Sequence, residues 1–535
     1  MNSQTVEQVR EQRGTGPKPI RTGLLALALA TLCVVPWHTP AKDWPQWGGT
    51  DGKNMVSQEM GLPDSFVPGE KDSETGRIKI ETAKNVKWGL KLCQAIYSTP
   101  AVAAGKIFIG GRQPGQGLMM CLDEKTGKLL WQWQGPARKV PEHIDGFLIG
   151  IGPNPEALGV CSSPIVDGER VYFMAHNFVL VCLDINGQPP GPQAGRARVL
   201  WEFDLWDKFG VFPCDAANGS PVIDGDLLYV QTSNGVDRNM EPAKELRRKV
   251  PAPQAPNLIV LDKRTGRLVA TDDAPIASRL LHGQWSSPSL GTVAGRKLVF
   301  YGGGDGFCYA FAALPSVPDK PVKLETAWFC DCVPPEYKAT GDLDPVSYYV
   351  LGDKRRKGTV NKNDGAFVGV SEIIATPVLC QNRVYVAIGR DPEHGRGRGA
   401  LLCIDAAQTG DITQTGKLWS YQGLDRTLST VSIAGGLLYV SDVAGRLHCL
   451  DAGNGRCYWV HEANAQTWAS TLVADGKVYM PTSKNLFVLA AAREKNILRQ
   501  INLGAPIFAS PVAANGTLYL ASRNGWLWAV SQTSP

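Results

Sequence analysis

Residues 429–459 read STVSIAGGLLYVSDVAGRLHCLDAGNGRCYW, and this stretch contains the pattern that decides the fold. A short apolar strand follows Thr430, and a Gly-centred turn leads into a second apolar strand that contains Tyr439. A third strand ends in Leu450-Asp451, a turn around Gly455 follows, and a fourth strand carries Trp459. Four short strands in about 40 residues is the repeat length of one β-propeller blade.

The opening phrase of this unit, Ser-Ser/Thr-Pro or a close variant, recurs eight times along the chain. Its copies are Ser98-Thr99-Pro100, Ser162-Ser163-Pro164, Gly219-Ser220-Pro221, Ser286-Ser287-Pro288, Ala375-Thr376-Pro377, Ser429-Thr430-Val431, Ser470-Thr471-Leu472 and Ala509-Ser510-Pro511. With the last three units starting at 431, 472 and 511, the spacings are 41 and 39 residues. Longer spacings, such as that between Pro288 and Pro377, indicate insertions, and we expect one at residues 315–364.

The two ends of the repeat array predict how it closes. The last unit runs through Trp526-Leu527-Trp528-Ala529-Val530 and has no fourth strand of its own, whereas Asn85–Leu90 has the fourth-strand pattern. Pairing these ends removes two open sheet edges. The sequence therefore predicts an all-β, eight-bladed propeller of four-stranded blades, closed by an N-terminal strand that completes the last blade. Two smaller sheet domains are the alternative.

The N-terminal region predicts an exported protein. Residues 1–41 combine a net-positive stretch, an apolar run from Gly23 to Trp37 and a small-residue site at Thr39-Pro40-Ala41, which is typical of a signal peptide. A retained membrane anchor is the alternative. We assign residues 42–84 to an N-terminal extension and 85–535 to the propeller. The periplasm or cell envelope is the expected location.

The charge distribution argues against nucleic acid as a partner. There are 55 Lys+Arg and 50 Asp+Glu residues, and no basic stripe of the kind that binds nucleic acid. We expect a monomer whose partners are envelope proteins or a small polar ligand.

Six of the thirteen cysteines form two groups. Four occupy one register of the third strand and are interpreted as small buried apolar groups: Cys121, Cys182, Cys403 and Cys449. Cys330 and Cys332 form the one closely spaced pair, either a loop cross-link or two thiols.

These repeats resemble those of the quinoprotein alcohol dehydrogenase-like superfamily, which has PQQ-like propellers. The stretch Asp43-Trp44-Pro45-Gln46-Trp47-Gly48-Gly49 is similar to the mature start of exported PQQ-like proteins of the planctomycete type. The resemblance implies either an assembly scaffold of the BamB type or a PQQ-dependent dehydrogenase with Ca²⁺. The sequence lacks the adjacent cysteine pair and the Cys-x-x-Cys-His haem motif that such dehydrogenases often carry.

Candidate site residues were assigned by topology. In a four-stranded blade, the loop entering strand one and the loop between strands two and three emerge on the same face, and functional groups favour such loops. Asp391, Glu393 and His394 follow a second strand and could bind a cation, with Ca²⁺ on Asp391 and Glu393, or perform acid–base chemistry. A solvated turn is the alternative.

Further candidates enter other units on the same face. His282 and Trp285 could stack a planar ligand, although Trp285 could equally cap a blade edge. Glu372, Asp215 and Asn218 are additional ligand-binding candidates, with surface charge or turn chemistry as the alternative. Trp468 lies on this face by the same rule.

Two functions follow from these observations. The first is a non-enzymatic binding or scaffold propeller in the cell envelope. The second is a PQQ-dependent oxidoreductase acting on an alcohol or polyol, such as a polyvinyl-alcohol-type dehydrogenase.

Overall fold

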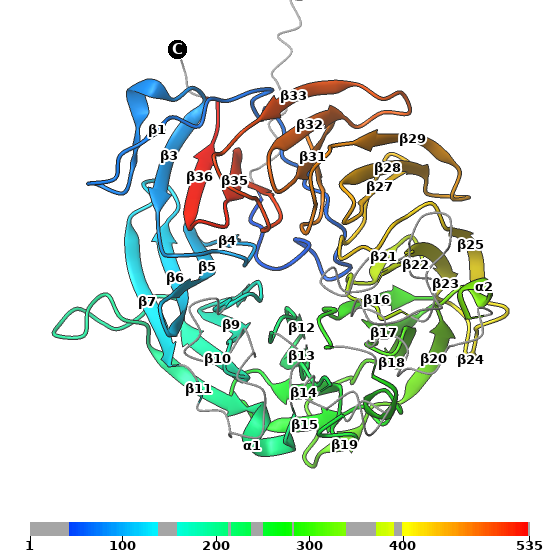
Figure 1. Ribbon diagram of the computed structural model, residues 1–535. Helices are drawn as coiled ribbons and strands as arrows, with labels where there is room; N and C mark the ends of the chain where they lie inside the picture. The colour runs from blue at the N-terminus through cyan, green and yellow to red at the C-terminus, as the bar shows by residue number, and fades with distance from the viewer. Residues whose placement is uncertain are drawn as a thin grey trace, which may run out of the picture. The chain divides into compact units, whose positions relative to one another are not determined.

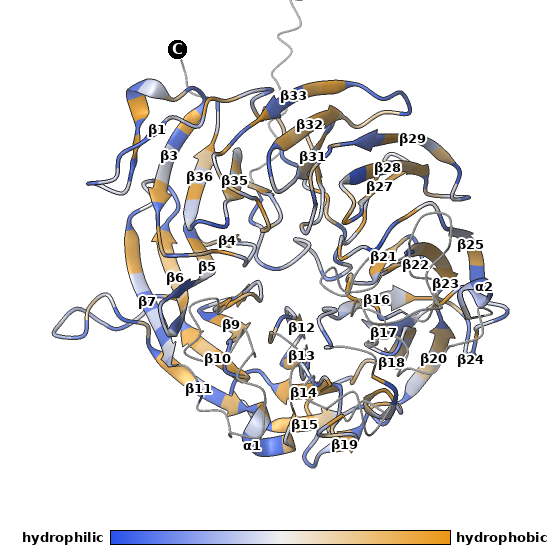
Figure 2. Ribbon diagram, in the orientation of Figure 1, coloured by the Kyte–Doolittle hydropathy of each residue, from blue (hydrophilic) through white to orange (hydrophobic). Residues whose placement is uncertain are grey.

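The compact unit of the chain comprises Pro40–Pro535, and its strands form eight consecutive antiparallel sheets around a central axis (Figure 1). The computed structural model describes residues 42–136, 138, 158–211, 216–236, 250–280, 283–338, 371–389 and 398–532. The predicted all-β, eight-bladed propeller is confirmed. Figure 2 shows the strands to be largely hydrophobic and the connecting turns largely hydrophilic.

Each blade contributes four strands, numbered here from the axis outward. Blades 1 to 4 contain β4 (Ala101–Ala103), β5 (Lys106–Gln113), β6 (Gln116–Asp123), β7 (Leu129–Pro136); β8 (Ile165–Asp167), β9 (Arg170–Met174), β10 (Val179–Asp184), β11 (Val199–Asp204); β12 (Val222–Asp224), β13 (Leu227–Gln231), β14 (Leu258–Asp262), β15 (Leu268–Thr271); and β16 (Ser289–Val293), β17 (Arg296–Gly302), β18 (Phe307–Ala312), β20 (Thr326–Asp331). Blades 5 to 8 contain β21 (Val378–Cys380), β22 (Arg383–Ile388), β23 (Ala400–Asp405), β25 (Lys417–Tyr421); β26 (Ser432–Ala434), β27 (Leu437–Ser441), β28 (Arg446–Asp451), β29 (Cys457–Glu462); β30 (Leu472–Ala474), β31 (Lys477–Pro481), β32 (Leu486–Ala490), β33 (Ile497–Ile501); and β34 (Val512–Ala514), β35 (Thr517–Ala521), β36 (Trp526–Val530), β3 (Val86–Lys91).

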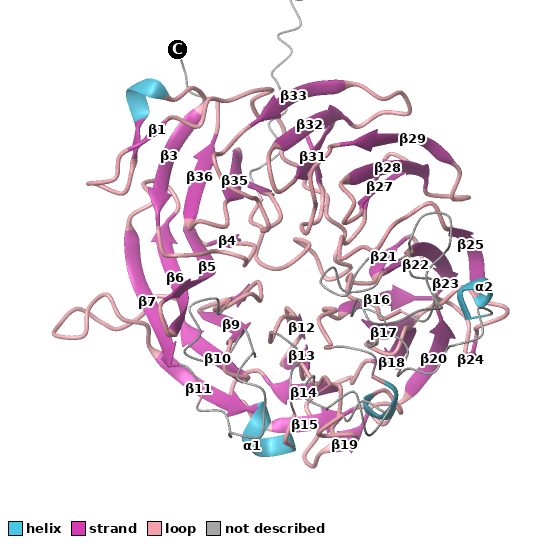
Figure 3. Cartoon of the chain, in the orientation of Figure 1, coloured by secondary structure: helices cyan, strands magenta, loops and turns pink. Residues whose placement is uncertain are grey.

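The remaining elements are short and lie outside this four-strand scheme (Figure 3). They are β1 (Glu70–Lys71), β2 (Ile78–Lys79), β19 (Val322–Lys323), β24 (Gly410–Asp411), α1 (Leu205–Phe209), α2 (Pro335–Lys338) and the 3-10 turns Ile80–Thr82 and Ala277–Arg279. β19 adds a parallel fifth strand to blade 3, and β24 does the same for blade 4.

Closure follows the prediction from the two ends of the array. β3 pairs antiparallel with β36, with Leu90 opposite Leu527 and Lys91 opposite Trp526. The fourth strand of the last blade therefore comes from the N-terminal side of the first blade, and neither sheet edge is left open.

The repeated tryptophan of the fourth strand joins neighbouring blades. Trp131 of blade 1 is buried, and its indole N–H donates to the Ile185 carbonyl of blade 2 at 3.0 Å. The indoles of Trp88, Trp201, Trp328 and Trp459 make the same bond to the next blade around the axis, at 3.0–3.3 Å. Each of these side chains thus combines a large apolar contact with one directional hydrogen bond.

Glycine in the hairpin turn makes room for this tryptophan. Gly455 has a φ of 76°, and a Cβ at this position would lie 2.6 Å from the Trp419 ring of the preceding blade. The Asp451 carboxylate accepts the Gly453 backbone N–H at 2.8 Å and closes the turn. The Asp…Gly…Trp spacing in the sequence therefore encodes both a turn and an interface between blades.

The cysteine interpretation also agrees with the structure. Cys121, Cys182, Cys403 and Cys449 are fully buried free thiols in the third strands. Cys330 and Cys332 are likewise buried free thiols, so they do not form a loop cross-link.

The structure corrects two details of the repeat boundaries. In the seventh unit, Ser470 rather than Thr471 is equivalent to Thr430 and Ser510, and both spacings are 40 residues. The expected insertion at 315–364 begins too early, because β20 within it is the fourth strand of blade 4. This strand carries Trp328 but lacks the preceding Asp…Gly turn, which is why the sequence pattern did not reveal it. Residues 339–364 lie outside the described part.

One structural element was not anticipated. Residues Trp44–Ser57, which we call the axial coil, run once around the axis and hydrogen-bond to the first strand of blade after blade (Figure 1). The partners are Val102, Val166, Pro221, Leu290, Leu379, Val431, Val473 and Ala513, one from each of the eight blades. The coil therefore crosses the centre of the propeller and lies against all eight innermost strands.

Candidate functional site

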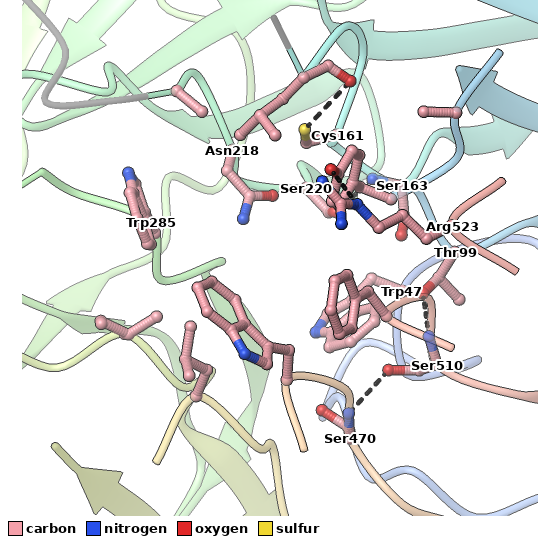
Figure 4. Close-up of a pocket in the computed structure, with 18 of the residues that line it drawn as sticks. Trp47, Thr99, Cys161, Ser163, Asn218, Ser220, Trp285, Ser470, Ser510 and Arg523 are labelled. Atoms are coloured by element: carbon pink, nitrogen blue, oxygen red, sulfur yellow. Dashed lines mark hydrogen bonds between the residues drawn. The ribbon is translucent and has the colours of Figure 1, made fainter. Parts of the chain in front are cut away.

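A cavity of about 770 Å³ lies on the axis, lined by residues from all eight blades (Figure 4). Trp47 of the axial coil also lines the cavity, and its indole N–H donates to the Thr376 hydroxyl at 3.0 Å. The coil's partners lie one or three residues after the lining residue that begins each blade, so the coil lies beneath the cavity. The volume is within the roughly 300–1,000 Å³ range of small-molecule sites.

Eight hydroxyl side chains encircle this cavity, one from the residue that begins each blade. This hydroxyl ring consists of Thr99, Ser163, Ser220, Ser287, Thr376, Thr430, Ser470 and Ser510. Six links of one kind connect neighbours, in which a backbone N–H donates to the hydroxyl oxygen of the next blade at 2.8–3.2 Å. The last of them joins Ser510 to Thr99 and so bridges blades 8 and 1.

These links leave the hydroxyl protons available. An oxygen that accepts a backbone N–H still carries its own O–H donor. Among the described residues, no group accepts a hydrogen bond from any of the eight ring hydroxyls. The ring therefore presents converging O–H donors to whatever occupies the cavity.

Replacing Ser470 with alanine is expected to destabilise the propeller by about 1–3 kcal/mol, because the Thr430 backbone N–H loses its buried acceptor. Urea unfolding of the Ser470→Ala variant measures this loss. Ser163→Ala is the matched control, since within the described structure the Ser163 hydroxyl accepts no such bond, and it should cost only a few tenths of a kcal/mol. Equal losses in both variants would contradict a stabilising role for the links.

Tyr97, Trp468 and Phe508 form an aromatic wall of the cavity. Each of them lies two residues before a residue of the hydroxyl ring. Phe508 stacks on Tyr97 with centroids 6.1 Å apart and lies 5.7 Å from Trp468. The Arg523 guanidinium covers the Tyr97 and Phe508 rings at about 6 Å and donates to the Tyr97 hydroxyl at 2.9 Å. Arg523 comes from the β35–β36 turn. The two rings and the hydrogen bond to Tyr97 hold its guanidinium in place.

The charged side chains in the described lining of the cavity are both cationic. Arg112 and Arg523 both line it, and no Asp or Glu is among its described lining residues. Burial raises the pKa of the Cys161 thiol to about 12, so this lining residue is neutral near pH 7. Burial likewise raises the pKa of Tyr97. The described lining therefore favours an anion over a cation.

Some of the candidate residues from the sequence line the cavity, one does not, and the others lie outside the described residues. Trp285 and Asn218 line the cavity, as does Trp468, and their roles in ligand binding stay predictions. Glu372 is fully buried and is not a lining residue, although Ile374 two positions later is. Asp215, His282, Asp391, Glu393 and His394 lie outside the described residues.

Sequence reasoning missed the hydroxyl ring and the floor residue Trp47. The Ser/Thr before each Pro was visible as a repeat phrase, and it was the signal that could have revealed the ring. Trp47 lies in the stretch that resembles the start of exported PQQ-like proteins, but nothing marked it as a cavity residue, because the axial coil has no repeat.

Neither a metal cluster nor a spanning helix is found in the described part. There, no group of three or more His, Cys, Asp or Glu residues could hold a metal ion. No helix of these residues is both long and apolar enough to cross a membrane.

Comparison with known proteins agrees with the repeat pattern. The family model described as outer membrane protein assembly factor BamB, a PQQ-like repeat model, matches residues 352–461 and 411–496. The matched residues lie within the eight-bladed propeller and cover less than half of the chain. No curated protein sequence matches it.

Solved structures similar to this propeller share its fold at low identity. A europium-containing methanol dehydrogenase aligns with a TM-score of 0.52 and 13% identity over 90% of each chain. BamB from Moraxella catarrhalis aligns at 0.48 and 14%, covering 83% of this chain and 96% of its own. The quinohemoprotein alcohol dehydrogenase from Comamonas testosteroni aligns at 0.43 and 13%, covering 92% and 81%. At these identities the similarity establishes the fold alone.

Proposed function

We propose that this chain is a binding propeller of the cell envelope that holds a small polar ligand in its axial cavity, in the manner of a scaffold or binding protein. The observation that carries the proposal is the hydroxyl ring, in which O–H donors from all eight blades converge on one cavity. Such a lining orients a ligand by hydrogen bonds. The match to the BamB model supports a non-enzymatic role with envelope proteins as further partners.

The cavity is built for rigid binding. Six ring links tie neighbouring blades together, and the axial coil holds Trp47 against Thr376 from below. Groups held in this way lose little conformational entropy when a ligand binds.

A PQQ-dependent oxidoreductase acting on an alcohol or polyol is the second candidate, favoured by the similarity of the fold to the methanol dehydrogenase. The described residues fit PQQ itself but not its Ca²⁺ ion. Arg112, Arg523 and the aromatic wall suit the carboxylates and flat rings of PQQ. The described lining offers no carboxylate that could bind Ca²⁺.

Incubation of the purified full-length protein with PQQ and Ca²⁺ separates the two functions. We expect no reduction of an electron-accepting dye when methanol, ethanol or glycerol is added. A thermal-shift screen of small polar anions should instead raise the melting temperature, because a ligand that binds only the folded state stabilises it. Quinone-dependent dye reduction with an alcohol would overturn the binding function in favour of the oxidoreductase.

A further inference from the structure

We propose that the axial cavity binds a sugar acid, meaning a saccharide ring that carries a carboxylate. This inference rests on the proposed binding function and specifies its ligand. It follows from three properties of the lining: its charge, its mixture of donors and acceptors, and its aromatic wall.

The positive charge of the described lining favours a ligand that carries a carboxylate. Arg112 and Arg523 are cationic, the described lining has no carboxylate, and the ring hydroxyls offer further O–H donors. A carboxylate has two acceptor-only oxygens, so it pairs with both kinds of donor. The Arg523 guanidinium is already anchored to the Tyr97 hydroxyl, which fixes its position for such a contact.

The side-chain amides of the lining favour a ligand that carries hydroxyl groups. Gln94, Asn218 and Gln466 line the cavity, and within the described structure their side-chain amides make no hydrogen bond. Gln94 and Gln466 are exposed and Asn218 is half-buried, so water bonds to these amides in the absence of a ligand. A ligand that displaces this water must offer an acceptor to the N–H₂ group and a donor to the oxygen. Sugar hydroxyls provide both, whereas a flat aromatic polycarboxylate has no O–H to offer. A site built to bond hydroxyls discriminates strongly against an analogue that lacks them.

The aromatic wall supplies the remaining surface. Trp468 and Phe508 lie 5.7 Å apart and tilted by 37°, and Trp285 lines another part of the cavity. Indole and phenyl faces carry negative potential and attract the weakly positive C–H groups of a pyranose face. Polar groups around the edge of the sugar and an apolar contact on its face match this lining.

Isothermal titration with galacturonate and galactose tests the proposal, because these two sugars differ only in the carboxylate. We expect galacturonate to bind at least about tenfold more tightly than galactose to the full-length protein. Phthalate, a flat aromatic dicarboxylate without hydroxyls, is expected to bind more weakly than galacturonate.

Two variants assign the binding to the cavity. Arg523→Gln should weaken galacturonate binding about tenfold or more and leave galactose binding nearly unchanged. Gln466→Glu keeps the side-chain size but adds a negative charge, and it should abolish galacturonate binding selectively. Arg499→Gln is the matched control, since Arg499 is exposed on β33 and does not line the cavity, and it should change neither affinity.

The contrary outcomes are distinct. If phthalate or PQQ binds more tightly than galacturonate and loses affinity in the Arg523→Gln variant, the sugar acid is wrong and the binding function stands. If none of these ligands binds or raises the melting temperature at millimolar concentration, both proposals fail. Equal affinity for galactose and galacturonate overturns the role of the acid.

Discussion

A chain that begins at residue 92 is expected not to fold into a closed propeller, because it lacks both the axial coil and β3. This strand buries Val86, Trp88 and Leu90 against β36 and the first blade, with exposures of 2–7%. At about 1.5–3 kcal/mol for each large buried side chain, the loss is comparable with the roughly 5–15 kcal/mol stability of a typical protein. It also removes the Trp88 bond to the Glu124 carbonyl that joins blade 8 to blade 1.

The exposed edge adds a second consequence. Without β3, the strand Trp526–Val530 presents an unpaired apolar edge that favours aggregation. Thermal unfolding followed by circular dichroism, together with gel filtration, measures both effects. A chain that begins at residue 42 is the control, since it keeps every described strand. A cooperative transition at the same temperature in both chains would show that the axial coil and closure by β3 are dispensable.

The eight blades and their closure could be predicted because the signals are local and repeated. Asp451, Gly455 and Trp459 lie within nine residues, and each acts through a turn or a strand that short-range chemistry defines. The unit-seven register failed by one residue because Ser470 and Thr471 are both hydroxyl residues. The bonds from Thr430 to Ser470 and from Ser470 to Ser510 distinguish them.

Contacts between distant segments could not be predicted in this way. The axial coil binds strands that range from Val102 to Ala513, and an irregular backbone has no period to detect. The hydroxyl ring closes between Ser510 and Thr99, which are 411 residues apart. Propeller geometry was nonetheless sufficient to assign Trp285, Asn218 and Trp468 to one face, since alternate loops of each blade share it.

Between pH 7 and pH 9.5 the wild type is expected to gain stability relative to the Lys53→Met variant, because of the buried ammonium group in the axial coil. Lys53 is fully buried, and its ammonium group donates to the Gln46 side-chain oxygen at 2.6 Å and to the Pro221 carbonyl at 3.3 Å. Burial lowers the pKa of Lys53 to about 7, and the nearby Asp51 carboxylate only partly offsets this effect. The unfolded chain keeps the ordinary pKa of 10.5.

The direction of the effect follows from proton binding. Between pH 7 and 10.5 the unfolded state holds a proton on Lys53 that the folded state has released, so the contribution of Lys53 to the free energy of unfolding rises with pH. Below pH 7 both states are protonated, and the folded protein bears the full cost of the buried charge. At about 1.36 kcal/mol per pH unit, the rise from pH 7 to 9.5 is roughly 3 kcal/mol.

Urea unfolding of the wild type and the Lys53→Met variant at both pH values isolates this contribution as the difference between the two profiles. Burial raises the pKa of several cysteines, which lowers the stability of both proteins equally as the pH rises. Methionine keeps the apolar stem of the side chain and removes the charge. Lys208→Met is the control, since Lys208 is exposed on α1 and should follow the wild type. Parallel pH profiles for wild type and Lys53→Met would mean that the ammonium group is solvated, and that the coil does not seal the channel around it.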